Sequence, residues 1–205
     1  MADKTAFDIL FDKLSERGMN PVKHVSERSF IIPGKDRFLN AKFIVASYNS
    51  LFYFSSDSYG TTAYSSKTFT GIFGAINLPP ETDCHIYKKD WVDLIFRRHK
   101  RKTGIKFIDE NLTITSVTDW IPSLLLQETD INLYLEINKR INPLKITIEY
   151  DYLSMIPDLK GKTIVGIETD LWLTEDNDLD TIILLGGRVI EDIINTCALT
   201  QAHTI

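Results

Sequence analysis

The sequence predicts an α+β fold: a mostly antiparallel sheet with an N-terminal helix, a central helix and a long C-terminal helix. Three observations lead to this prediction. Apolar residues recur at helical spacing near both ends of the chain, whereas the middle contains short runs that alternate apolar and polar residues. Alternation with one polar face is typical of antiparallel strands. The 205 residues, 43% hydrophobic and 25% charged, suit one globular domain over 1–205, with 201–205 as a frayed tail.

A helix is expected at residues 4–17, within an N-terminal element that covers 1–18. Its apolar positions follow the spacing i, i+3, i+4 and i+7 and form one stripe: Phe7, Leu10, Phe11 and Leu14. Thr5 or Asp3 is placed to cap the start of the helix, and Gly18 is placed to end it. The stripe must dock on an apolar surface. Two alternatives stay open here, namely the protein's own core and the groove of a partner.

The region that follows contains the most β-rich part of the chain. Residues 19–37 read as irregular because Pro21 and Pro33 interrupt them. Beyond them, 48–50 is predicted as a hairpin turn, and the short polar residues of 56–66 as a loop. The strands expected in this part are 29–32, 41–47, 51–55, 67–76 and 84–87.

Two central elements are ambiguous between helix and strand. Residues 91–96 fit either type. Residues 131–141 place apolar side chains on one helical face, but 131–137 also alternate as a strand does. We favour a helix there because asparagines are poor strand formers and Lys139-Arg140 suit a helix C-terminus. The other central predictions are a strand at 105–108, a turn at 109–111, a strand at 112–115 and a helix start at 118–122.

The last third of the chain opens with the clearest strand, 144–150, whose apolar residues alternate with Lys145, Thr147 and Glu149. Gly186-Gly187 falls inside the expected C-terminal helix and costs about 1 kcal/mol per glycine relative to alanine, which suggests a break or a close approach by another backbone. The remaining expectations are a piece pairing nearby at 152–156, a turn at 157–162, extended pieces within 163–174 and a helix at 178–199.

Composition restricts the partner and the compartment. The formal net charge of -5 disfavours nucleic acid as a partner. The N-terminus carries Asp3, Asp8 and Asp12 and lacks the apolar core of a signal peptide. No run approaches the roughly 18 apolar residues needed to span a bilayer. Cys84 and Cys197 are therefore expected as buried free thiols in a reducing compartment, and the protein as cytoplasmic.

The sharpest electrostatic feature is the basic run 97–102. Its candidates for anion binding are Arg97, Arg98, Lys100, Arg101 and Lys102. Such a run can hold the phosphates of a nucleic acid or nucleotide, or lipid headgroups at a membrane surface. The alternative is an exposed loop whose charge serves solubility.

No metal ion and no cofactor are expected. Asp176, Asp178 and Asp180 have the spacing of the first ligands in an EF-hand loop. However, Thr181 stands where that loop needs glycine, and Gly187 where it needs a bidentate glutamate. Carboxylates in this position are favourable at a helix N-terminus. The four histidines show no metal-ligand spacing.

Two further patterns favour structural roles. Cys84 and His85 are adjacent, but on a strand their side chains point to opposite faces, which argues against a catalytic Cys–His pair. The aromatic residues of the β-rich part suit core packing, with Phe52 and Phe54 on one face and Tyr53 presented on the other; a ligand groove is the alternative. The aromatic set is Tyr48, Phe52, Tyr53, Phe54, Tyr59 and Tyr64.

Two segments, 69–73 (FTGIF) and 105–126, resemble an uncharacterised bacterial family. In that family a soluble α+β domain commonly follows two transmembrane helices. The resemblance covers about residues 67–175, and the transmembrane helices have no counterpart in this chain. It implies no catalytic residue. The positions that match the family's serine-x-aspartate turn and leucine-pair helix are Ser116, Asp119, Leu124 and Leu125.

These observations lead us to expect a non-enzymatic binding or scaffold module of a bacterial cytoplasmic protein, with a protein partner as one option. The patterns look like core throughout, and no recognisable catalytic motif appears. Two alternatives stay open. One is a hydrolase with an acid/base site built from scattered Asp and Glu residues. The other is a peripheral membrane or anion-binding protein that uses the basic run 97–102.

Overall fold

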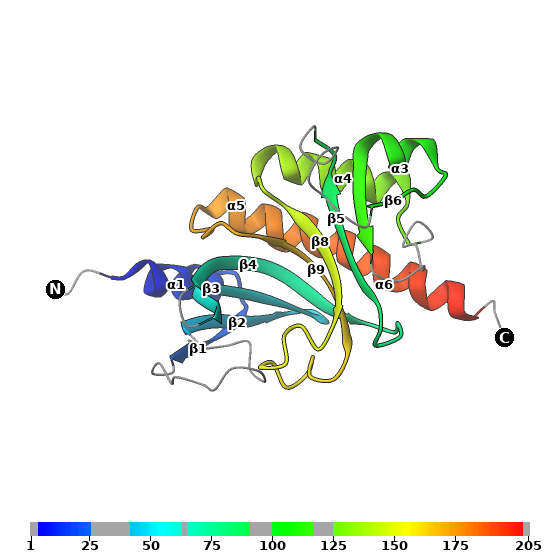
Figure 1. Ribbon diagram of the computed structural model, residues 1–205. Coiled ribbons are helices and arrows are strands. Elements are labelled where there is room, and N and C mark those ends of the chain that lie inside the picture. The colour runs from blue at the N-terminus through cyan, green and yellow to red at the C-terminus, as the bar shows by residue number, and fades with distance from the viewer. Residues whose placement is uncertain (1–3, 26–41, 63–64, 91–99, 117–124, 203–205) are drawn as a thin grey trace.

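The computed structural model describes residues 4–25, 42–62, 65–90, 100–116 and 125–202. Within these residues nine strands form one antiparallel sheet, in the order β1-β2-β3-β4-β9-β8-β5-β7-β6 (Figure 1). The predicted α+β class is confirmed. The strands are β1 Asn20–Val25, β2 Lys42–Tyr48, β3 Leu51–Thr62, β4 Ser65–Ile76, β5 Asp83–Lys88, β6 Lys100–Arg101, β7 Leu112–Ser116, β8 Lys145–Tyr150 and β9 Thr163–Thr169.

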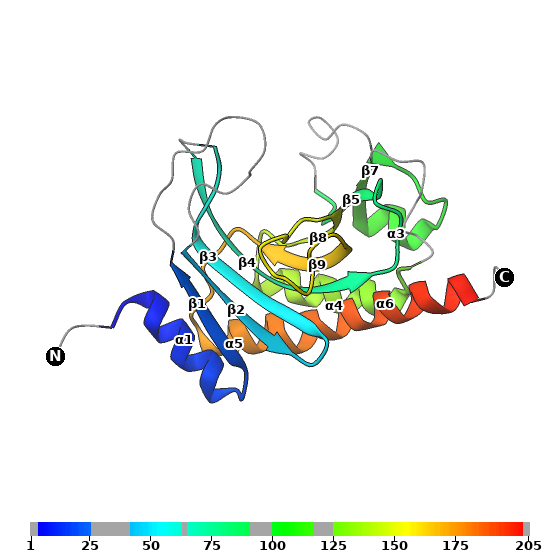
Figure 2. The ribbon, with the colours of Figure 1, turned by 90° about the horizontal axis from the view of Figure 1, so that it is seen from below.

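The helices pack mainly on one face of the sheet (Figure 2). Their bounds are α1 Ala6–Glu16, α3 Lys106–Asn111, α4 Glu128–Arg140, α5 Asp176–Asp180, the π-helical η2 Thr181–Gly186 and α6 Gly187–Ala202. The last three follow one another without a gap and form the long C-terminal helix. The helix favoured at 131–137 is confirmed by α4.

The N-terminal helix α1 docks on the protein's own core. Thr5 and Asp8 form a reciprocal capping box at its start, and Gly18 follows its end with φ +73°. Leu10 and Leu14 are fully buried. Arg17 holds the helix to α5 through ion pairs with Asp176 (3.0 Å) and Asp180 (2.8 Å). The acidic run 175–180 therefore ties α1 to the start of the long C-terminal helix.

The sheet carries an apolar layer on each face. The helix-side core contains the buried residues of α1, α4, η2 and α6, together with Tyr53, Ile72 and Ile167 from the strands. A second apolar cluster lies on the opposite face, under residues 151–162 (Figure 2). It consists of Phe43, Phe54, Phe69, Phe73, Leu153, Ile156, Leu159 and Ile164. The prediction that one face presents Tyr53 is wrong, because both faces are covered here and Tyr53 is fully buried.

Glycine makes room for one ring of the second apolar cluster, that of Phe73. A Cβ on Gly166 would lie 2.1 Å from Phe73, and one on Gly71 would lie 2.6 Å from the same ring. Gly186-Gly187 does not break the C-terminal helix. It lets η2 and α6 approach β4 closely, since a Cβ on Gly187 would lie 3.3 Å from Ile72.

Two local predictions near the turns are wrong for identifiable reasons. Residues 105–108 were expected as a strand, and 109–111 as a turn, but 106–111 form α3. The Asp109 carboxylate accepts the backbone N–H groups of Thr103 and Gly104, which starts a helical turn. Residues 152–156 form turns, because Leu153, Ile156 and Leu159 cover the second apolar cluster at a spacing of three.

Two strands are longer or earlier than predicted. Residues 20–25 form β1, where Pro21 is tolerated because this strand lies at the edge of the sheet. The expected loop 56–66 is mostly the paired ends of β3 and β4, with register shifts after Ser56 and Gly60. Backbone pairing there continues through short polar residues, which composition alone assigns to loops. The predictions at 29–32, 91–96 and 118–122 lie outside the described residues.

Candidate functional site

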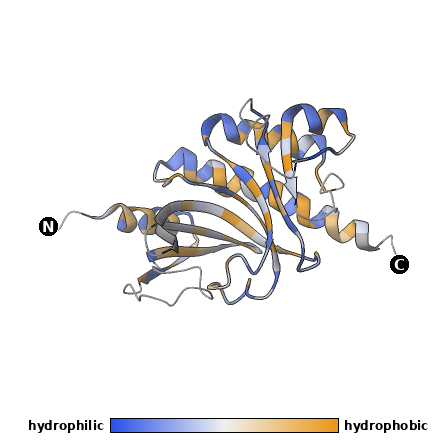
Figure 3. Ribbon diagram, viewed as in Figure 1, coloured by the Kyte–Doolittle hydropathy of each residue, from blue (hydrophilic) through white to orange (hydrophobic). Residues whose placement is uncertain are grey.

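A group of polar side chains lies on the face of the sheet that the helices leave uncovered. The intervening residues Cys84, Ile146 and Ile167 belong to the helix-side core, so their neighbours along each strand point the other way. The colouring of β5 and β8 in Figure 3 follows this alternation. We call the group the polar face; it comprises Asp83, His85 and Tyr87 of β5, Lys145, Thr147 and Glu149 of β8, and Glu168 of β9.

Strand register brings these side chains together from distant parts of the chain. His85 stands opposite Thr147, and Tyr87 stands opposite Lys145. On the next strand Lys145 stands opposite Glu168. Directly opposed residues on one face are near neighbours, so the polar face is one continuous group of side chains across three strands.

Glu168 is the centre of this group and is fully buried. Its Oε1 lies 2.5 Å from Lys145 Nζ and accepts hydrogen bonds from the hydroxyls of Thr147 (2.9 Å) and Tyr152 (3.3 Å). Its Oε2 is buried and has no hydrogen-bond partner among the described residues. Burial raises the pKa of Glu168 above its ordinary value, while the Lys145 ammonium opposes that rise.

Lys145 connects the buried carboxyl to the surface, because its side chain is 29% exposed. Burial disfavours its charge, but the Glu168 carboxylate outweighs burial, so the pKa of Lys145 lies above its ordinary value. The two groups therefore act as a unit with little net charge.

His85 lies between a carboxylate and a hydroxyl. Its Nε2 is 3.5 Å from Asp83 Oδ1, and its Nδ1 is 3.4 Å from Thr147 Oγ1. Burial and, next, the Lys145 ammonium lower the pKa of His85, whereas Asp83 and Glu149 oppose the shift. The ring is consequently mostly neutral near pH 7, since its pKa lies below 6.5.

The order Asp83, His85, Thr147 has the outline of a nucleophilic triad, but the geometry does not fit one. The Thr147 hydroxyl donates its proton to Glu168, so His85 has no proton to accept from it. Thr147 is also 1% exposed. A substrate atom therefore cannot reach this oxygen. The arrangement suits the holding of polar groups better than covalent chemistry.

The structure disperses the residues singled out in the basic run. Arg97 and Arg98 lie outside the described residues. Lys100 and Arg101 form β6, which pairs with β7, and Lys102 is exposed. Arg101 is half-buried and stands opposite Ile114 of the helix-side core. The described part of the run is thus an edge strand rather than a free loop.

Other sequence candidates have structural surroundings. Cys84 belongs to the helix-side core, where burial, helped by Asp83, raises the pKa of its thiol to about 12. Asp178 of the acidic run forms an ion pair with Arg140 (2.5 Å). Across the described ranges, no group of three or more His, Cys, Asp or Glu residues is positioned for a metal ion. None of the helices described is long and apolar enough to cross a membrane.

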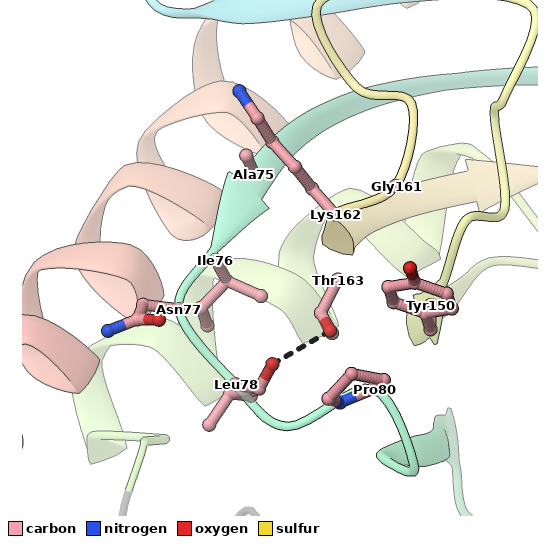
Figure 4. Close-up of a pocket in the computed structure, with 9 residues that line it drawn as sticks. All are labelled: Ala75, Ile76, Asn77, Leu78, Pro80, Tyr150, Gly161, Lys162 and Thr163. Carbon is pink, nitrogen blue, oxygen red and sulfur yellow. Dashed lines mark hydrogen bonds between the residues drawn. The ribbon is translucent and has the colours of Figure 1, made fainter.

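Two hollows lie near the ends of the central strands. The larger, about 420 Å³, is where β4 and β8 end and β9 begins (Figure 4). Thr163 donates a hydrogen bond to Leu78 O there (2.8 Å), and Tyr150 and Lys162 border the space. The smaller, about 180 Å³, lies between the end of β5, the last turn of α4 and residues 142–144.

Comparisons with protein-family models, with curated proteins and with solved structures find no match to this chain. The family resemblance of residues 67–175 therefore stays a prediction, and the site rests on its own geometry.

Sequence reasoning named His85 but missed Lys145, Thr147 and Glu168 as a group. One signal was present. Every residue of β9 is buried, and Glu168 is the charged residue among them. A carboxylate inside an otherwise apolar or small run is seldom fully buried unless it is paired.

Proposed function

We propose that this protein is a binding module that holds a small polar ligand on the polar face, over β5 and β8. The observation that carries the proposal is a fully buried carboxyl, Glu168, connected through Lys145 and Thr147 to side chains that reach the surface. The proposal agrees with the binding module expected from the sequence.

Folding alone does not explain the buried ion pair, because desolvation of the two charges offsets most of the stability that their attraction contributes. Removing a carboxylate and an ammonium from water costs several kcal/mol per ion, and replacing such a pair by apolar residues is often neutral or stabilising. The second apolar cluster shows that this chain covers the same side of the sheet with apolar residues elsewhere. Shifted titratable groups gather at functional sites, which supports a ligand-binding role for the polar face.

The charges indicate the class of ligand. Glu168 matches the charge of Lys145, and His85 is mostly neutral at pH 7. The Asp83 carboxylate, whose side chain is 45% exposed, then adds negative charge beside the ring. A small organic cation that carries hydroxyl groups satisfies both the carboxylate and the neutral polar atoms.

The proposal is tested by titrating the protein with glucosamine, glucose and gluconate, which share a carbon skeleton and differ in charge. NMR of backbone amides and of the His85 ring reports binding. We expect glucosamine to shift the signals of β5 and β8 at millimolar concentration, with weaker shifts for glucose and the weakest for gluconate. Asp83→Asn should weaken glucosamine binding, whereas Glu110→Gln on the exposed side of α3 should not.

The binding assignment fails if none of the three sugars shifts signals on the polar face. It also fails if all three shift them equally, since charge would then play no part. Hydrolysis by scattered carboxylates and anion binding by 97–102 stay predictions from the sequence, because no described contact favours either.

A further inference from the structure

The buried carboxyl of Glu168 has one oxygen that the described residues leave unused. Lys145, Thr147 and Tyr152 all bind to Oε1. Oε2 is buried as well, and it accepts no hydrogen bond from a described residue. An unpaired oxygen on a buried carboxylate is costly, so this position calls for a hydrogen-bond donor from outside the described chain.

Glu168 lies at the boundary between polar and aromatic surroundings. Its neighbour on β8 is Lys145, and its neighbour on β4 is Gly71, which has no side chain. The ring of Phe73 fills the space beside that glycine, 2.6 Å from where a Cβ on Gly71 would lie. A ligand that reaches Oε2 therefore meets charged groups on one side and phenylalanine rings on the other.

Tyr152 occupies this boundary. Its ring lies edge-on to Phe69, at 5.8 Å between centroids, and 6.3 Å from the ring of Phe73. Its hydroxyl donates to Glu168 over 3.3 Å, which is long for an O–H···O hydrogen bond. The residue is only partly buried. Tyr152 is thus an aromatic ring with a donor group, held weakly and near the surface.

Tyr152 belongs to the loop 151–162, which joins β8 to β9 (Figure 1). Every backbone-to-backbone hydrogen bond that this loop makes with the described chain stays within the loop. Its two ends are held together, because the Asp151 N–H donates to Lys162 O (2.9 Å) and the Asp151 carboxylate accepts the N–H of Gly161 (2.7 Å). Tyr152 can therefore move out without breaking a bond between strands.

We propose that Tyr152 holds the place of the ligand, and that this ligand is a small aromatic amine. Its ring replaces that of Tyr152 beside Phe69 and Phe73, and its ammonium donates to Glu168 Oε2. An ammonium forms a stronger hydrogen bond to a carboxylate than a phenol does, which favours the exchange. The inference rests on the cation binding proposed for the polar face and adds the aromatic ring and the way in.

Tyramine, tyrosol and para-hydroxyphenylacetate test the assignment, because they share a hydroxyphenyl group and carry an ammonium, a hydroxyl and a carboxylate respectively. NMR of the Tyr152 ring and of the amides of 151–162 reports binding to the wild type. We expect tyramine to shift these signals at millimolar concentration and to bind at least tenfold more tightly than tyrosol. The carboxylate should bind most weakly.

Tyr152→Ala removes the competing ring, so it should bind tyramine at least threefold more tightly than the wild type does. A cavity created by the substitution would take tyramine and tyrosol equally, so the tenfold preference for tyramine must persist in this variant. Tyr150→Ala, at a side chain 40% exposed, is the matched control and should bind tyramine as the wild type does.

Three results would each overturn the inference. These are an absence of shifts at Tyr152 with tyramine, equal binding of tyramine and tyrosol, or weaker tyramine binding in Tyr152→Ala, which would make Tyr152 a part of the site. Glucosamine separates this inference from the proposed function. Shifts from glucosamine without shifts from tyramine would overturn the aromatic ligand alone, whereas shifts from neither would overturn both. Shifts from tyramine alone would support the aromatic site and exclude a sugar.

Discussion

The side of the sheet opposite the helices has two halves, one lined by apolar side chains and the other by polar ones. Over β2, β3 and β4, phenylalanines pack beneath residues 151–162 to form the second apolar cluster. Over β5 and β8, the same side carries charged and hydroxyl groups. β9 belongs to both halves, since Ile164 joins the apolar cluster and Glu168 joins the polar face.

The difference separates side chains that stabilise the fold from side chains that contribute little to its stability. The apolar half gains from burial alone, because each phenylalanine removed from water contributes about 1.5–3 kcal/mol. The polar half gains little from its buried ion pair and depends on every partner being present. Substitutions should therefore lower stability in the first half, and should lower it in the second only when they leave a group unpaired.

The largest effect is expected from Phe73→Ala. The ring is fully buried, fills the space left by Gly71 and Gly166, and contacts Phe69 at 5.7 Å between centroids. Its removal leaves a cavity and should cost about 3–5 kcal/mol. Urea unfolding measures the loss. A cost below about 1 kcal/mol would mean that the apolar half is not a packed core.

The second effect concerns the ion pair of the polar half. Lys145→Met leaves Glu168 buried without its counter-ion and should cost about 3 kcal/mol near pH 7. Adding Glu168→Leu removes the stranded charge, so the double variant should return to within about 1 kcal/mol of wild type while losing glucosamine binding. Lys139→Met, which breaks an exposed pair with Glu136, should cost less than about 0.5 kcal/mol. A double variant as unstable as the single one would contradict this account.

One part of this contrast, the polar face of β8, was visible in the sequence. Lys145, Thr147 and Glu149 were expected on one face of the clearest strand, and they are. The helices at both ends followed from apolar spacing. The partner of Lys145 did not follow, because pairing of β8 with β9 joins residues 23 positions apart and no local pattern fixes that register.

The local misses have a common cause. In both segments a few side-chain contacts decide the backbone conformation. In 106–111 the Asp109 carboxylate accepts the N–H groups of residues 103 and 104. In 152–156 the turns place apolar side chains on the second apolar cluster. Such contacts decide the local structure more strongly than an alternation of apolar and polar residues over only four or five positions.

Tyr152→Phe should have a smaller effect and tests the boundary between the halves. The ring packs edge-on against Phe69, at 5.8 Å between centroids, while its hydroxyl donates to Glu168. Losing only the hydroxyl should cost about 0.5–1 kcal/mol, because this hydrogen bond is long. Tyr150→Phe, at a side chain 40% exposed, should change stability by less than about 0.5 kcal/mol. Equal losses in both variants would remove Tyr152 from the network.

The smallest effect is a pH dependence confined to the polar half. The pKa of His85 is lowered in the folded protein, so the unfolded chain binds more protons just below pH 6.5. The stability that neutral His85 contributes is therefore present above 6.5 and is lost as pH falls toward the folded pKa. Relative to His85→Gln, the wild type should lose less than about 1 kcal/mol between roughly pH 7 and pH 5. Asp83→Asn removes a carboxylate that opposes the shift and should enlarge this loss, but only while His85 is present. The same slope in Asp83→Asn/His85→Gln as in Asp83→Asn would place the titrating group elsewhere.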